Sequence, residues 1–228
     1  MPDRVLVVAA HPDDEVLGCG ATMARLAREG HEVFIAILGE GFNARHASSE
    51  TPDAGAVQRL RDECRRVATL LGAKDLFLHA LPDNRFDTVS LLDVVKVVEA
   101  VIDRVRPRVV YTHHGGDLNV DHAICSRAVL PATRPLPDGP VAEVMMFEVP
   151  SSTEWSFQRY APAFHPTVFV DVHDTLETKV QALALYQGEA RAFPHPRSPE
   201  ALRAIARRWG STVGVHAAEA FELVRAVR

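Results

Sequence analysis

Short, continuous apolar runs recur along the chain, and longer amphipathic segments separate them. The runs are rich in β-branched residues, which is typical of strands buried on both faces of a parallel sheet. Strands are expected at residues 5–10, 33–38, 76–78, 109–112 and 144–149. Apolar residues at helical spacing predict helices over about 13–30, 56–71, 90–104 and 123–129. This alternation predicts an α/β fold with a mostly parallel sheet in the common strand order 3-2-1-4-5.

The C-terminal third of the chain follows a less regular pattern. Prolines interrupt residues 131–140, which indicates a linker. A strand is expected at 167–172, followed by a helix that Asp174 caps. The remaining predicted elements are a helix over about 199–209 and a last edge strand at 219–224.

Length and composition narrow the class of protein. The 228 residues suit one domain, residues 1–228, with a core at 1–150 and a smaller C-terminal α/β portion at 151–228. A hydrophobic content of 47% is enough for a packed core. The net charge of −5 gives no reason to expect nucleic acid as a partner, and no apolar run is long enough to span a membrane.

The cysteines indicate the cellular compartment in which the protein is expected. Cys19, Cys64 and Cys125 are widely spaced, and each lies in a predicted helix. This arrangement is typical of small buried hydrophobic residues in a reducing environment rather than of disulfides or a cysteine zinc site. A cytoplasmic protein is therefore expected.

Candidate chemistry gathers where the first predicted strand becomes the first predicted helix. Pro12 ends the strand, and His11, Asp13 and Asp14 are crowded at the turn. His11 and Asp14, three positions apart, can hold one divalent metal, which leaves Asp13 free to act as a base. Each residue alone would also fit a helix cap or a backbone hydrogen bond. A second cluster is needed to favour the metal site.

That second cluster follows the predicted strand at 109–112. Residues 113–122 form a glycine-rich turn with imidazole and acidic groups before the next helix. Strands one and four are neighbours in the predicted order, so His122 should face His11 and Asp14 across the crevice at the sheet edge. A His-Asp-His set with an open position for water is the catalytic form of a metal site.

Two other interpretations fit the residues less well. Gly18-Cys19-Gly20 resembles part of a dinucleotide fingerprint, but it lies one turn into the helix, behind carboxylates that would repel a pyrophosphate. Close packing of this helix on the sheet is the predicted role of the glycines. A phospho-receiver module would need an Asp after strand three and a Lys after strand five, and this sequence has neither there.

Two motifs carry a resemblance to a known family. They are AHPDDEVLGCG, from Ala10 to Gly20, and HHGGDLNVDH, from His113 to His122. With them the chain resembles the LmbE/PIG-L family of metal-dependent de-N-acetylases, and the element spacing agrees from about Val5 to Val129. The C-terminal segments SSTEW and PHPRS are similar to one bacterial branch of the family.

The resemblance implies a Rossmann-like three-layer fold and zinc-dependent hydrolysis. His11, Asp14 and His122 would be the Zn2+ ligands, with other divalent metals left open, and Asp13 would be the general base that activates the attacking water. The implied reaction removes an N-acetyl, or other N-acyl, group from an N-acetylglucosamine-type sugar or conjugate. That small molecule is the implied partner, and a homo-oligomer is left open.

One position departs from the family pattern. Many members carry a His three positions before the last metal-binding His, and this chain has Asn119 there. An Asn amide can donate a hydrogen bond but cannot shuttle a proton. His113, His114 and His173 are candidates for supplying the missing imidazole.

Substrate contacts are expected mainly from loops at the ligand edge of the sheet. Polar loops at 39–53, 81–85 and 193–198 are predicted to lie on this rim. The candidate substrate-binding residues are Arg59, Asp117, Asn119, His195 and Arg197. The resemblance suggests Arg59, although the nearby Arg61 confuses that assignment.

Two alternatives for the function stay open. A zinc amidase acting on a small non-sugar amide would keep the same metal site. A catalytically inactive, sugar-binding relative would be consistent with Asn119, although the intact Asp13 argues against it.

Overall fold

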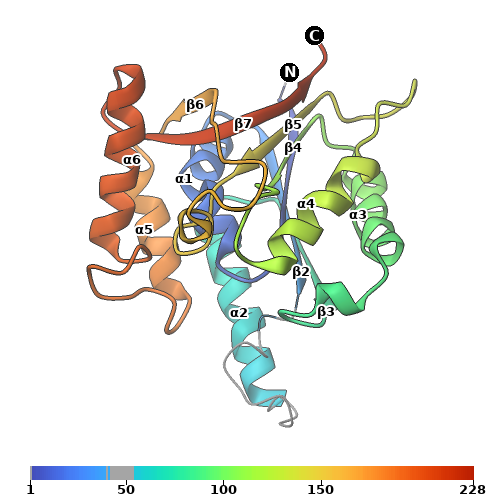
Figure 1. Ribbon diagram of the computed structural model, residues 1–228, viewed down its shortest axis with the longest axis horizontal. Helices are drawn as coiled ribbons and strands as arrows, with labels where there is room; N and C mark the ends of the chain where they lie inside the picture. The colour runs from blue at the N-terminus through green and yellow to red at the C-terminus, as the bar shows by residue number, and fades with distance from the viewer. Residues whose placement is uncertain (1, 40, 42–53) are drawn as a thin grey trace.

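The computed structural model describes residues 2–39, 41 and 54–228, and within them one seven-stranded sheet forms the centre of the molecule (Figure 1). The strand order is β3-β2-β1-β4-β5-β7-β6. Neighbours from β3 to β5 are parallel, and β7 is antiparallel to both β5 and β6. The strands are β1 (Arg4–Ala9), β2 (Glu32–Gly39), β3 (Asp75–Leu81), β4 (Val109–His113), β5 (Glu143–Phe147), β6 (Val168–Asp171) and β7 (Ala218–Ala226). The predicted α/β class and the order 3-2-1-4-5 are confirmed.

Helices cover both faces of the sheet and so complete three layers. They are α1 (Asp14–Arg28), α2 (Ala54–Leu70), α3 (Leu91–Val105), α4 (Val120–Ala132), α5 (Leu176–Leu185) and α6 (Pro199–Val213), with short 3-10 turns η2 (Phe86–Thr88) and η3 (Glu154–Ser156). Helices α3 and α4 share one hydrophobic core with the sheet, and α1, α2 and α5 share the other. In Figure 1, α3 and α4 lie to the right of the central strands, and α1, α5 and α6 lie to the left.

Burial on both faces explains the continuous apolar run of β1. Val5 and Val7 belong to the core beneath α1 and α2, whereas Leu6 and Val8 belong to the core beneath α3 and α4. All four side chains are buried. Odd- and even-numbered positions of β1 therefore both need apolar residues, as in other parallel sheets with helices on each side.

The glycine pair in α1 has the packing role predicted for it at Gly18. A Cβ added at Gly18 would overlap the ring of Phe147 in β5, so only glycine allows this approach of helix to sheet. The three cysteines are also buried and free, as expected.

The predicted edge strand at 219–224 was wrong. These residues lie in β7, which pairs with β5 on one side and β6 on the other, so β6 forms the edge of the sheet. After β5 the chain first forms β6, which does not pair with β5. It then forms β7, which lies between β5 and β6 and is antiparallel to both. A short apolar strand does not reveal how many neighbours it has.

Two helix ends also differ from expectation. Thr175, not Asp174, occupies the N-cap position of α5, and the Asp174 carbonyl instead accepts a hydrogen bond from Arg28. Helix α4 begins at Val120 because the Asn119 side chain accepts a hydrogen bond from the Asp121 amide, 2.8 Å away. The same helix continues through Pro131, so the predicted linker begins after it.

The predicted loop at 39–53 lies outside the described residues, except for Gly39 and Gly41. Among the residues that the structure describes, no helix is both long and apolar enough to cross a bilayer.

Candidate metal centre and active site

A cavity of about 520 Å³ opens at the edge where the parallel strands end. Its wall comes from the β1–α1 turn, the segment after β3, the β4–α4 turn, the segment after β5 and the α5–α6 loop. Six predicted site residues line it, namely His11, Asp13, Asp14, Asn119, His122 and Arg197. Segments far apart in sequence thus meet at one site, as the switch point between β1 and β4 predicts.

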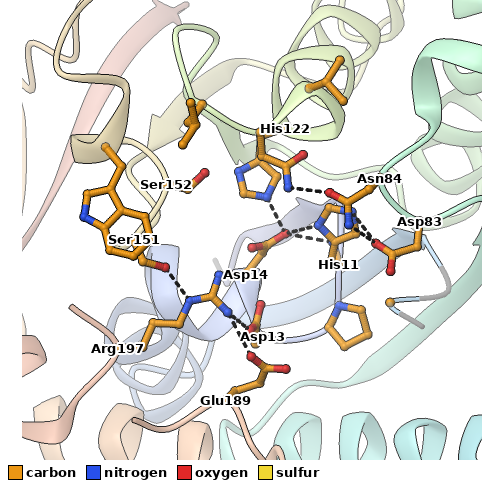
Figure 2. Close-up of a pocket in the computed structure, with 16 residues that line it drawn as sticks. His11, Asp13, Asp14, Asp83, Asn84, His122, Ser151, Ser152, Glu189 and Arg197 are labelled. Carbon is orange, nitrogen blue, oxygen red and sulfur yellow. Dashed lines mark hydrogen bonds and ion pairs between the residues drawn. The ribbon is translucent and has the colours of Figure 1, made fainter. Parts of the chain in front are cut away.

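His11, Asp14 and His122 converge at the base of this cavity (Figure 2). His11 Nδ1 lies 3.2 Å from Asp14 Oδ2, and His122 Nε2 lies 3.1 Å from the same oxygen. One nitrogen or oxygen atom of each residue falls within 4.8 Å of the others. Two imidazoles and one carboxylate are ligands that zinc commonly takes in catalytic sites.

The outer nitrogens of both imidazoles face further carboxylates. His11 Nε2 lies 2.9 Å from Asp121 Oδ2 and 3.2 Å from Asp83 Oδ1. His122 Nδ1 lies 3.1 Å from Asp117 Oδ1. Carboxylates behind metal-binding histidines commonly fix the ring orientation and raise the basicity of the ligand. The residues therefore fit a divalent cation held by the inner nitrogens and Asp14.

The charge of the surroundings agrees with this fit. Burial acts to lower the pKa of His11, but nearby carboxylates, led by Asp121, outweigh it and raise the pKa to about 10. Burial likewise opposes a proton on His122, and Asp14 and Asp117 raise its pKa to about 9. Burial would raise the pKa of Asp14, yet the neighbouring imidazoles hold it well below its usual range. Carboxylates that raise the pKa of two buried imidazoles would also stabilise a cation bound between them.

Asp13 is held in an unusual backbone conformation. Its φ of 102° lies in the left-handed region, which a residue other than glycine rarely adopts. Its amide donates to Glu15 Oε2 at 3.1 Å, and the Tyr186 hydroxyl donates to Glu15 Oε1 at 2.6 Å. Glu15 and Tyr186 are both buried, so this chain of hydrogen bonds supports the strained turn from within the core.

The Asp13 carboxylate is paired with a guanidinium, whereas the Asp14 carboxylate faces the two imidazoles. Arg197 Nη1 lies 2.6 Å from Asp13 Oδ2 and 3.0 Å from Glu189 Oε2, and Arg197 Nε donates to Ser151 Oγ (Figure 2). Asp13 is 3% exposed, and burial raises its pKa to about 8 although the Arg197 charge opposes the rise. Adjacent aspartates thus occupy different environments, one among imidazoles and one beside a guanidinium.

Residues 6–133 match the family model of PIG-L, described as GlcNAc-PI de-N-acetylase. This match spans more than half of the chain. The chain belongs to the PIG-L family. The resemblance that the two motifs carry is therefore confirmed.

Curated relatives of this PIG-L protein include deacetylases. The uncharacterized deacetylase YaiS of Escherichia coli (strain K12) is 30% identical over 185 residues, which cover 78% of this chain and 88% of that protein. The diacetylchitobiose deacetylase of Thermococcus kodakarensis is 26% identical over 226 residues, which cover 97% of this chain and 83% of that protein.

The fold is shared more widely than this activity. The crystal structure of GalB, the 4-carboxy-2-hydroxymuconate hydratase from Pseudomonas putida KT2440, aligns with a TM-score of 0.77 over 99% of this chain and 98% of that one, at 22% identity. At this identity the likeness shows the fold alone. The reaction of the PIG-L protein must be argued from its site.

The position that departs from many PIG-L proteins, Asn119, lies on the cavity wall. Its side-chain oxygen caps α4, and its Nδ2 donates to Asn84 Oδ1 at 3.1 Å. None of the three candidate imidazoles lines the described cavity wall. His113 is buried behind His122 with its ring stacked on it, His114 is buried against Glu222, and His173 is exposed after β6.

The other predicted substrate-binding residues lie away from the described wall of the cavity. Asp117 is buried behind His122, where Thr153 and Ser152 also donate to its carboxylate. His195 packs its ring edge-on against Trp155, and its Nδ1 accepts from the Arg197 amide. Arg59 is exposed on α2.

Six further residues support or line the site and were not predicted from the sequence. They are Glu15, Asp83, Asn84, Asp121, Glu189 and Tyr186. Asp83 and Asn84 lie in the rim loop predicted at 81–85, Glu15 lies in the first motif and Asp121 lies in the second, so a weak signal existed for these four. Glu189 and Tyr186 follow a helix in the C-terminal portion and carry no motif that sequence reasoning could use.

Proposed function

We propose that this PIG-L protein is a zinc-dependent N-deacetylase that acts on an N-acetylglucosamine-type sugar or conjugate. The observation that carries the proposal is the convergence of His11, Asp14 and His122 beside a buried, separately held Asp13 in one cavity. A bound divalent cation would polarise the amide carbonyl, acidify the attacking water and help to keep Asp13 ionised.

Asp13 is the general base in this proposal. Its carboxylate would take a proton from the attacking water and return it to the amine leaving group. The Arg197 contact holds one oxygen of Asp13 in place and favours the ionised form. Glu15 accepts the hydrogen bond of the Asp13 amide and so supports the backbone turn that carries Asp13.

Asn119 would assist as a hydrogen-bond donor to the developing oxyanion. Its Nδ2 carries two hydrogens, and the bond to Asn84 uses one of them. The second is available on the cavity wall. In this arrangement the Asn119 side-chain amide donates the hydrogen bond to the oxyanion. Asp13 alone accepts the proton of the water and returns it to the amine.

The named relatives support the sugar amide as substrate class. The diacetylchitobiose deacetylase of T. kodakarensis and the family description both point to N-acetylglucosamine groups. A zinc amidase for a non-sugar amide and an inactive sugar-binding relative are the alternatives. A reducing cytoplasm, which three buried free cysteines favour, is the proposed location.

Acetate release tests the proposal directly. The purified protein would be freed of metal with a chelator, reloaded with zinc, and assayed against N-acetylglucosamine, N,N′-diacetylchitobiose and N-acetylated amines that contain no sugar. We expect acetate from the sugars only after reloading. Acetate from the non-sugar amides alone would favour the amidase, and sugar binding without acetate release would favour the inactive relative.

A further inference from the structure

Asn119 is held in place through both its backbone and its side chain. Its backbone N–H donates to Asp117 Oδ1 at 2.9 Å, and the same oxygen lies 3.1 Å from His122 Nδ1. Its side-chain Nδ2 donates to Asn84 Oδ1 at 3.1 Å. The backbone is thereby linked to one of the proposed metal ligands, and the side chain is oriented from a different segment, the turn after β3.

The turn after β3 links Asn119 to the other histidine of the proposed ligand set. Asn84 Nδ2 donates to Asp83 Oδ1 at 3.1 Å, and that oxygen lies 3.2 Å from His11 Nε2 (Figure 2). The hydrogen bonds therefore run from Asp83 through Asn84 to Asn119. Two chains of contacts, one from each proposed ligand histidine, meet at Asn119.

The groups at the two ends fix the direction of both side-chain amides. An ionised carboxylate can only accept, so Asn84 turns its NH2 group to Asp83 and its oxygen to Asn119. At the other end the Asp121 backbone N–H donates to Asn119 Oδ1 at 2.8 Å. A reversed Asn119 amide would set two oxygens against each other and lose the cap of α4. The NH2 group of Asn119 is therefore the part that faces Asn84 on the cavity wall.

We propose that Asn84 is a positioning residue for the reaction, which aims the second N–H of Asn119 at the oxyanion that forms when water attacks the amide. This inference rests on the proposed deacetylase function and adds a residue to it. In this role Asn84 acts through Asn119 and does not contact the reacting atoms. A donor oriented in advance needs no rearrangement as the negative charge develops, so its misplacement lowers kcat more than it raises KM.

Asn84→Gly removes the contact with little backbone strain. Asn84 has a φ of 52°, a left-handed conformation that glycine adopts without the cost of a Cβ. For the zinc-loaded full chain and an N-acetylated sugar that it deacetylates, we expect kcat to fall roughly tenfold, a part of what complete removal of an oxyanion donor costs, and KM to change by less than about twofold. Arg85→Ala is the matched control and should leave kcat unchanged, because Arg85 is exposed in the same turn and lies outside the described cavity wall.

A double-variant cycle separates positioning from an independent effect. Asn119→Ser keeps an oxygen that can cap α4 but removes the amide donor, so kcat should fall by about 10²- to 10³-fold. Adding Asn84→Gly to this variant should lower kcat further by less than about twofold, because no donor remains to be positioned. Losses that multiply in the double variant would mean that Asn84 acts by another route, and they would overturn the inference.

Side-chain amide signals in nuclear magnetic resonance provide a readout that does not depend on turnover. In isotope-labelled, chelator-treated protein, the two Nδ2 protons of Asn119 are recognised by their absence from the spectrum of Asn119→Ser. One of these protons is bonded to Asn84, so the two shifts should differ clearly. In Asn84→Gly the two shifts should move together, whereas in Arg85→Ala they should stay apart.

The possible results distinguish this inference from the proposed function. An unchanged kcat in Asn84→Gly, or Asn119 signals that do not move, would overturn the inference while leaving the deacetylase function in place. A raised KM with an unchanged kcat would make Asn84 a substrate contact instead. Acetate release from none of the sugars would contradict the proposed function, and the amide signals would then report separately whether Asn84 orients Asn119.

Discussion

Asp13 and Arg197 are 184 residues apart in sequence and form a contact of 2.6 Å at the wall of the cavity. The contact ties the turn after β1 to the loop that precedes α6, and Ser151 binds the same guanidinium from the segment after β5. Three segments therefore meet on one side chain. The C-terminal portion is part of the proposed active site, because it supplies the guanidinium that contacts the proposed base.

Removal of the Arg197 charge should shift the pH dependence of activity. Burial raises the pKa of Asp13 and Arg197 opposes the rise, so Arg197→Met should raise this pKa further. Asp13 acts in its ionised form, and the acidic limb of kcat/KM should therefore move to higher pH by about one unit or more. The profile measured from about pH 5 to 9 checks this.

Arg197→Lys is the control for that prediction. Lysine keeps the positive charge but cannot reproduce the forked contacts with Asp13 and Ser151. Its acidic limb should remain closer to that of the unaltered protein than the limb of Arg197→Met. A large rise in KM for Arg197→Met without any shift of the limb would instead assign Arg197 to substrate binding alone.

Gly18 and Gly20 should respond differently to alanine. The added Cβ at Gly18 would overlap the Phe147 ring, whereas the Cβ at Gly20 would meet the side chains of Lys179 and Val16, each at 3.3 Å. Gly18→Ala should destabilise the fold by about 1–3 kcal/mol through overpacking. Gly20→Ala should cost less than Gly18→Ala, because its neighbours need to shift by only a few tenths of an ångström and alanine favours the helix. Urea unfolding of both variants is the measurement, and equal losses would contradict the packing role of Gly18.

His114 and Glu222 predict a pH-dependent part of the stability. Burial lowers the pKa of His114, but Glu222, 2.6 Å away, outweighs it and leaves the pKa raised. A raised folded-state pKa gives stability that is complete below the unfolded value of about 6.5 and is lost as pH rises through the folded value. Glu222→Gln should therefore destabilise the protein more near pH 6 than near pH 9.

An exposed pair provides the comparison for this experiment. Glu99 contacts a lysine and an arginine, Lys96 and Arg134, rather than a histidine. Glu99→Gln should accordingly cost little and cost the same at both pH values. Unfolding midpoints in urea report both effects. A Glu222→Gln effect that does not change with pH would mean that His114 stays neutral in the folded protein.

The parallel part of the sheet could be predicted from the sequence because the apolar pattern of each strand there matches its burial in the fold. Val5 to Val8 are apolar in succession only because helices cover both faces, so the run itself predicts the layers. Strand β7 was placed wrongly at the edge because its sequence does not record that β6 pairs with its far side. Pairing in the antiparallel part depends on where the chain returns, which is a property of the whole fold.

The site likewise contains residues that local sequence patterns predict and residues whose place depends on the whole fold. His11, Asp14 and His122 lie in two compact motifs at the ends of neighbouring strands, so topology alone predicts that they meet. The supporting residues Glu189 and Tyr186 reach the site from the C-terminal portion, and no local spacing links them to Asp13. Arg197 was predicted at the site from its loop, but its contact with Asp13 depends on side-chain geometry that a sequence does not contain.

The hydrogen bond from Tyr186 to Glu15 should matter for activity as well as stability. Tyr186→Phe keeps the ring and removes the donor, which should cost about 1 kcal/mol of stability. Because Glu15 also holds the Asp13 amide, kcat should fall while KM changes little. Steady-state kinetics beside urea unfolding separate the effects. A variant that is less stable but has an unchanged kcat would show that Glu15 keeps its position without the tyrosine.

The adjacent aspartates give the sharpest test, because they are chemically alike and have different predicted roles. Asp14 Oδ2 faces both imidazoles, and Asp13 Oδ2 faces Arg197. Asp13→Asn should keep its zinc and lose about 10²- to 10⁴-fold in kcat, the usual worth of a positioned base. Asp14→Asn should lose zinc, and His122→Ala should do the same. Elemental analysis beside kcat distinguishes the variants. If Asp13→Asn loses zinc while Asp14→Asn keeps it, the roles are exchanged, and if zinc-loaded Asp13→Asn is fully active, the base lies elsewhere.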